Sequence, residues 1–214
     1  LANGQGKVRA QRNGTARASQ QWRLLFLSAG EESLASLMAR CGRKANAGQE
    51  VRLADIDADA GVGLGAFEAL NGCAGPAALA QALKDATARH HGAAGIAWLQ
   101  AIVPDRDKLP DLITDGVRQF VSENTAADSA GQVIRVAQRF GLVAVAGELA
   151  TRYLVTGWAQ GEATRAASQC FVAWLGAFGD AGNRDDRALL AQVRGFFETH
   201  GASRFEDMTT GLDQ

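Results

Sequence analysis

A long alanine-rich tract with helical periodicity begins at Pro76, and it constrains the fold more than any other feature of the chain. Apolar residues recur in this tract at intervals of three and four, in six segments separated mostly by Gly, Asp or Asn. The spacing predicts helices over 76–91, 93–103, 109–123, 131–153, 161–178 and 185–200. The middle of the fourth segment is apolar nearly all round, so we expect that helix at the centre of the helical part.

The chain before Pro76 has a different pattern, which predicts strands. "WRLLFLS" (22–28) is a short apolar run typical of a strand covered on both faces. "EESLASLMARCG" (31–42) has helical spacing, and "QEVRLADID" (49–57) alternates as a strand does. Strand, helix and strand in succession predict a parallel α/β layer. We therefore expect an α/β domain over 1–75 and a mostly helical domain over 76–214.

The N-terminal segment is basic and predicts a hairpin. Residues 4–22 contain Lys7, Arg9, Arg12 and Arg17 and no acidic residue. Asn-Gly at 13–14, between stretches that alternate small or apolar residues with polar ones, predicts a two-stranded ribbon with Arg12 and Arg17 around its tip. A disordered arm is the alternative. Lysine and arginine side chains bind phosphates without sequence specificity, so these four residues are candidates for nucleic-acid contact.

Charge is distributed unevenly along the chain. Residues 1–52 hold nine Lys/Arg and three Asp/Glu, whereas residues 53–214 hold 13 Lys/Arg and 20 Asp/Glu. The asymmetry indicates that one end or face of the protein binds anions. The alternative is an ordinary surface with uneven charge. The net charge of −1 argues against a wholly basic nucleic-acid coat.

Several motifs of enzymes are missing or incomplete. "GVGLGA" (61–66) has the outline of a dinucleotide fingerprint, but "NGCAGP" soon interrupts the chain, which favours a glycine loop. No G-x-x-x-x-G-K-[ST] phosphate loop occurs. The cysteines and histidines lack the spacing of metal ligands, so we predict no metal site. No apolar run is long enough to span a membrane, and we expect a cytoplasmic location.

Arg135 and Arg139 lie one helical turn apart in the longest predicted helix and share a face. They form either a solvated stripe, an ion pair with Glu148 or another acid, or a pair of arginines directed at a nucleotide phosphate.

The order of the segments resembles a known family. The stretches are "LANGQGKVRA", "WRLLFLSAGE", "AGQEVRLADIDADAG", "GQVIRVAQRFGLVAVAGELA", "TGWAQGEA", "CFVAWL" and "VRGFFETHGASRF". Together they resemble the helicase-like proteins of plasmids, phages and integrative elements known as domain-of-unknown-function family 927, described as superfamily II helicases and inactivated derivatives. The resemblance implies an AAA+ type P-loop ATPase. Leu1 is not a methionine, and in the family's plan the phosphate loop and the acidic metal-binding strand lie upstream of it. The chain is then the rear part of an ATPase core followed by a helical lid.

The resemblance also implies roles for individual residues. Lys7, Arg9, Arg12 and Arg17 fall where such helicases carry a DNA-tracking hairpin. Ser28 falls at a sensor position, although Asn is commoner there, and Arg52 falls near an arginine finger that reaches a neighbouring subunit. Arg135 and Arg139 fall on a lid helix that supplies a second sensor arginine.

We therefore expect part of an ATP-dependent DNA helicase or translocase of a mobile genetic element. Its full-length parent uses ATP and Mg²⁺ and forms a homo-oligomeric ring, whereas the isolated chain needs no cofactor and cannot hydrolyse ATP alone. The alternatives are a non-enzymatic nucleic-acid-binding module, which is an inactivated helicase derivative, and a structural or assembly module.

Overall fold

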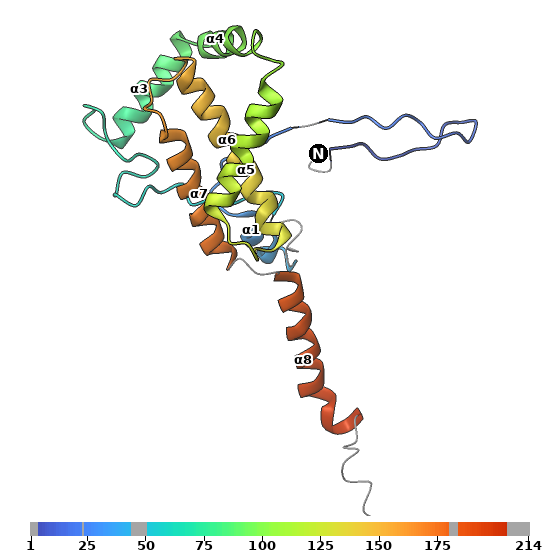
Figure 1. Cartoon of the computed structure of the whole chain (residues 1–214). Coiled ribbons are helices and arrows are strands. Elements are labelled where there is room, and N and C mark those ends of the chain that lie inside the picture. The colour runs from blue at the N-terminus through green and yellow to red at the C-terminus, as the bar shows by residue number, and fades with distance from the viewer. Residues whose placement is uncertain (1–3, 23, 44–50, 180–183, 205–214) are drawn as a thin grey trace, which may run out of the picture. The chain divides into compact units, whose positions relative to one another are not determined.

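The computed structural model describes residues 4–22, 24–43, 51–179 and 184–204. The chain divides into two units, Leu1–Leu53 and Ala54–Gln214. The helices within the described residues are α1 (Leu34–Arg40) in the first unit, and α3 (Pro76–Arg89), α4 (Ala93–Ile102), α5 (Leu109–Asn124), α6 (Gly131–Arg152), α7 (Glu162–Phe178) and α8 (Arg184–Arg204) in the second (Figure 1).

The first unit begins with an antiparallel ribbon, drawn in dark blue in Figure 1. Isolated bridges pair Ala10 with Ala16 near its tip and Gln5 with Gln21 at its base. The ladder is irregular between these two bridges, but the residues face one another in the same register on both sides of the irregularity. The ribbon predicted from the sequence is therefore confirmed, and the disordered arm is not what forms.

A three-residue loop closes the ribbon. The N–H of Gly14 donates to the carbonyl of Gln11 at 3.0 Å, and the N–H of Gln11 donates to the carbonyl of Thr15 at 2.7 Å. Gly14 has φ = +81°, whereas Asn13 does not have a positive φ. This combination is a type I turn followed by a left-handed glycine, rather than a two-residue turn that needs two positive φ angles. The Asn13 side chain supports the turn by accepting the N–H of Thr15 at 3.2 Å.

The predicted α/β layer is wrong. The described residues contain no sheet, and their only β structure is the pair of isolated bridges in the ribbon. Residues 24–28 are irregular and Leu27 is fully exposed, whereas a strand of the predicted kind has neighbours on both edges and cover on both faces. In the segment 49–57 the first two residues lie outside the described part, and the rest forms no strand.

The helical part, by contrast, follows the sequence closely. Each of the six segments predicted after Pro76 forms a helix, and the boundaries differ by a few residues at most. The helix predicted over 31–42 also forms, but as the shorter α1, because its N-cap is Ser33, whose Oγ accepts the N–H of Ser36 at 3.0 Å. Glu31 and Glu32 therefore precede this helix instead of lying in its first turn.

The core of the second unit lies between α5, α6 and α7, which run side by side (Figure 1). Helix α6 packs against both of the others, which confirms its predicted central place. Phe171 of α7 is fully buried, and its ring contacts the rings of Phe120, Phe140 and Trp174 at centroid distances of 6.4, 5.8 and 5.9 Å. Trp174 in turn stacks on Phe178 at 4.8 Å. A continuous aromatic row therefore fills the space between the three helices.

Glycines allow these helices to approach closely. A Cβ atom on Gly147 of α6 would lie 2.5 Å from the Cβ of Ala163, and one on Gly116 of α5 would lie 2.5 Å from Cγ2 of Val145. Gly141 is buried against the ring of Phe120. The α5–α6 and α6–α7 contacts thus depend on positions where no side chain fits.

Candidate nucleic-acid interface

The ribbon places two arginines opposite each other. The N–H of Arg17 donates to the carbonyl of Arg9 at 2.8 Å, so the two residues form a cross-strand pair. Side chains of such a pair project from the same face of a ribbon. Gln11 and Thr15 are the next pair of the same kind, so their side chains project from that face too. We call the face that carries Arg9, Gln11, Thr15 and Arg17 the cationic face.

The opposite face of the ribbon carries small, uncharged side chains near the tip. Ala10 and Ala16 pair between the two hydrogen-bonded pairs, so their side chains project away from the cationic face. Arg12 lies in the turn, and Lys7 lies two residues before Arg9 on the first strand. All four predicted cations of the ribbon are solvent-exposed. The structure therefore brings them together on one short ribbon.

The electrostatics of the ribbon are unbalanced. Residues 4–22 carry no carboxylate, and none of the four cations forms an ion pair with any residue that the structure describes. Like charges directly opposite each other on a ribbon are destabilising. The Arg9–Arg17 pair is thus an arrangement that an anion would stabilise, and a nucleic-acid phosphate is an anion that two guanidinium groups hold well.

The other two predicted site residues of the first unit, Ser28 and Arg52, lie outside any strand. Ser28 is exposed in an irregular segment, with no strand to hold it at a sensor position. Arg52 is exposed beside the buried Val51, again without a strand. The roles that the resemblance assigns to both residues rest on an α/β layer that the described residues do not form, so these roles stay predictions without that support.

Arg135 and Arg139 lie on α6 in the second unit, Arg135 exposed and Arg139 half-buried. An ion pair with Glu148 is one of the alternatives for these arginines, but the Glu148 carboxylate binds backbone N–H groups instead. One carboxylate oxygen of Glu148 accepts the N–H of Gly161 at 2.8 Å, and the other accepts the N–H of Thr164 at 2.9 Å. Glu148 therefore caps the N-terminus of α7.

The capping interaction shifts the ionisation of Glu148. Partial burial opposes its charged form, but the hydrogen bonds from the N–H groups of Gly161 and Thr164 outweigh burial. The pKa of Glu148 therefore lies below its ordinary value. Gly161, the N-cap residue of α7, has no side chain to cap the helix itself, so α6 supplies the cap instead.

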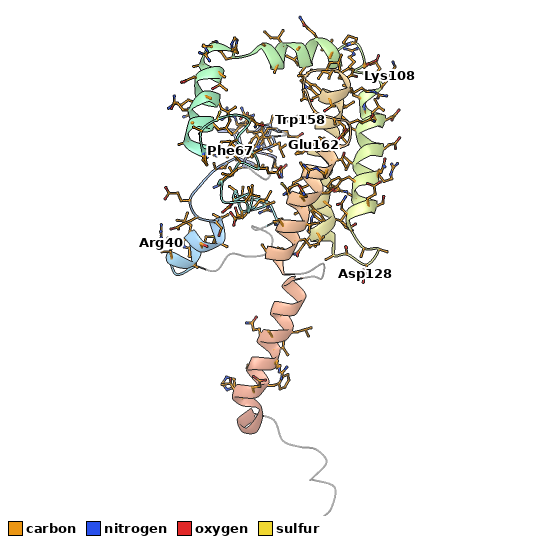
Figure 2. The ribbon with its side chains drawn as sticks, turned by 90° about the vertical axis from the view of Figure 1, so that its left-hand side faces the viewer. Arg40, Phe67, Lys108, Asp128, Trp158 and Glu162 are labelled. Carbon is orange, nitrogen blue, oxygen red and sulfur yellow. The ribbon has the colours of Figure 1, made fainter. Side chains whose placement is uncertain are left out.

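The sequence interpretation missed an acidic groove of about 580 Å³ in the second unit. It lies where the α4–α5 connection meets the end of α6, beside Lys108, which is labelled in Figure 2. Its lining residues are Asp105, Asp107, Lys108, Asp111, Leu112, Asp115, Arg152 and Tyr153. A signal for it exists in the sequence, because Asp107, Asp111 and Asp115 recur at intervals of four.

Hydrogen bonds tie the groove together. The Tyr153 hydroxyl donates to Asp105 at 2.9 Å, and Lys108 forms an ion pair with the same carboxylate at 3.0 Å. The hydrogen bond from Lys108 and that from Tyr153 lower the pKa of Asp105, and the bond to Asp105 raises the pKa of Tyr153. Since its carboxylates outnumber its cations, the groove repels phosphate, which leaves the ribbon as the better place for a polyanion.

Among the described residues, no three or more His, Cys, Asp or Glu side chains gather as a metal site would require. His90 is the C-cap residue of α3. No helix in the described ranges has the length and apolarity to cross a membrane.

The four predicted catalytic residues are divided between the two units. Ser28 and Arg52 belong to the first unit, and Arg135 and Arg139 to the second. None of the four lines the groove described above. The expectation of ATP and Mg²⁺ therefore stays a prediction, and we derive no chemical step through ATP.

Comparison with known proteins adds no relative. No protein-family model, curated protein or solved structure matches the chain. The resemblance to the helicase-like family therefore stays a prediction.

Proposed function

We propose that this chain binds nucleic acid through the basic ribbon at its N-terminus. The observation that supports the proposal most is the cross-strand Arg9–Arg17 pair, exposed on a ribbon without a carboxylate. Lys7 and Arg12 extend the same positive charge along the strand and into the turn. Such a ribbon supplies phosphate contacts, which give affinity and position without sequence specificity.

The proposal concerns binding and not hydrolysis. The sequence carries no phosphate loop, and the α/β layer that an ATPase core needs does not form in the described residues. A binding module is thus the part of the helicase-like expectation that the ribbon supports. Assembly without nucleic acid is the competing function, and it predicts that the cations of the ribbon are dispensable.

Salt dependence of binding tests the proposal. The full chain is titrated against a fluorescent oligonucleotide between about 50 mM and about 200 mM salt. Four phosphate contacts predict a slope of log K against log salt of about −3 for a single strand and about −3.6 for duplex DNA. A variant with Lys7→Gln, Arg9→Gln, Arg12→Gln and Arg17→Gln should bind the oligonucleotide at least about tenfold more weakly. Its slope of log K against log salt should be near zero.

A control variant with the same change in net charge is available. It carries Arg106→Gln, Arg118→Gln, Arg165→Gln and Arg194→Gln, each at an exposed arginine that forms an ion pair with an acid. This control should bind as the unsubstituted chain does. Equal loss in both variants would show that bulk charge, and not the ribbon, attracts the oligonucleotide.

A further inference from the structure

The dimensions of the ribbon suit one particular groove. Pairing runs from Gly4 and Trp22 at the base to Gln11 and Thr15 beside the loop, so each strand has eight residues. At about 3.3 Å per residue the ribbon is about 25 Å long, and its two strands lie about 4.8 Å apart. The major groove of B-form DNA is about 12 Å wide and admits a two-stranded ribbon, whereas the minor groove is about half as wide.

One face of the ribbon carries cationic and polar side chains and the other carries small methyl groups, an arrangement that suits insertion into the major groove. The cationic face combines two guanidinium groups with the side-chain amide of Gln11 and the hydroxyl of Thr15. Guanidinium and amide groups are the side chains that pair with guanine and adenine edges in the major groove. The other face carries the methyl groups of Ala10 and Ala16, which add little thickness to the ribbon.

The ribbon lacks the groups that bind single strands. Residues 4–21 contain no Phe, Tyr, Trp or His, and single-stranded nucleic acids are held chiefly by stacking of bases on such rings. Trp22 stands at the base, where a Cβ on Gly6 would lie 3.8 Å from its ring, so the ring packs on the ribbon itself. Double-stranded RNA is excluded by shape, because its major groove is too deep and narrow for side chains to read.

From these observations, and resting on the proposed function, we infer that the ribbon binds double-stranded DNA by inserting its cationic face into the major groove. Arg9 and Arg17 then face the base edges or the flanking phosphates, and Gln11 lies beside them. Arg12 and Lys7 contact phosphates at the two ends of the inserted stretch.

Direct competition among nucleic acids tests this inference. The full chain is titrated with a DNA duplex, one of its strands alone, and an RNA duplex of the same sequence. We expect the DNA duplex to bind about tenfold more tightly than either of the others. A dye that occupies the major groove, methyl green, should displace the chain from the DNA duplex, whereas distamycin, which occupies the minor groove, should not.

The Gln11→Ala variant adds a readout within the ribbon. It keeps every charge, so the salt slope should stay the same, while the preference for the DNA duplex over the single strand should fall. Thr125→Ala, at the end of α5, is the control and should change neither quantity.

The outcomes separate this inference from the proposed function. Salt-sensitive binding that favours the single strand or the RNA duplex, or that distamycin abolishes, would overturn major-groove binding and leave nucleic-acid binding intact. Absence of salt-sensitive binding to all three nucleic acids would overturn both.

Discussion

Arg9 and Arg17 face each other across the N-terminal ribbon, where the N–H of Arg17 donates to the carbonyl of Arg9 at 2.8 Å. Two cations in this relationship repel each other, and no carboxylate of the ribbon relieves the repulsion. The facing charges therefore destabilise the free ribbon, while the same charges favour the binding of an anion.

Arg17→Gln should stabilise the ribbon in the absence of nucleic acid and should weaken the binding of nucleic acid. Removing one of the facing charges should favour the paired state by about 0.2–1 kcal/mol. Cross-strand nuclear Overhauser effects between Ala10 and Ala16 at low salt measure that population. Arg12→Gln, in the turn and without a facing cation, is the control and should leave the population unchanged. A ribbon that weakens on Arg17→Gln would contradict the repulsion argument.

Gly14→Ala should open the tip of the ribbon. Gly14 has φ = +81°, and no atom lies within 4 Å of an added Cβ, so the cost is purely conformational. It amounts to about 1–2 kcal/mol for an L-residue in the left-handed region. Affinity for nucleic acid should fall although no charge changes. Gly14→Asn should cost less, because asparagine tolerates this region. If the unsubstituted chain, Gly14→Ala and Gly14→Asn bind nucleic acid with equal affinity, the folded tip is not needed for binding.

Gly147→Ala should destabilise the helical core. The added Cβ would lie 2.5 Å from the Cβ of Ala163, and neither atom can turn away without moving a helix backbone. We expect a loss of about 1–3 kcal/mol in the free energy of unfolding, measured by circular dichroism in urea. Gly176→Ala in α7 is the matched control, because an added Cβ there meets no atom within 4 Å. That control should gain up to about 1 kcal/mol from helix propensity.

Glu148→Gln should remove a pH-dependent part of the stability. The pKa of Glu148 is lowered in the folded protein, so its cap contributes fully above the ordinary glutamate value of 4.5 and is lost as the pH falls through the folded value. At about pH 7 the variant should be less stable by about 1 kcal/mol. Thermal melts at about pH 7 and about pH 3 check the sign, because the difference between the two proteins should shrink at the lower pH.

Glu123→Gln, at the exposed end of α5, is the control for this experiment. Its stability should differ little from that of the unsubstituted chain at either pH. A pH-independent deficit in Glu148→Gln would mean that the carboxylate acts by packing and not by its charge.

The sequence by itself determined the elements whose signals are local. The alternation around Asn13-Gly14 specifies the ribbon, and the intervals of three and four after Pro76 specify the helices, because neighbours a few residues away decide both patterns. The basic character of the ribbon can likewise be read directly, since no acid occurs between residues 4 and 22.

Contacts between distant residues decided the rest. The apolar run at 24–27 looked like a strand, but a strand also needs partners for its backbone, and none forms in the described residues. Glu148 looked like an ion-pair partner, but the N-terminus of α7 lies close enough for its N–H groups to take both oxygens. The opposition of Arg9 and Arg17 arises only because a three-residue loop sets the register. Tertiary structure decided these features because each depends on which groups meet in space, and the spacing of residues along a chain does not specify that.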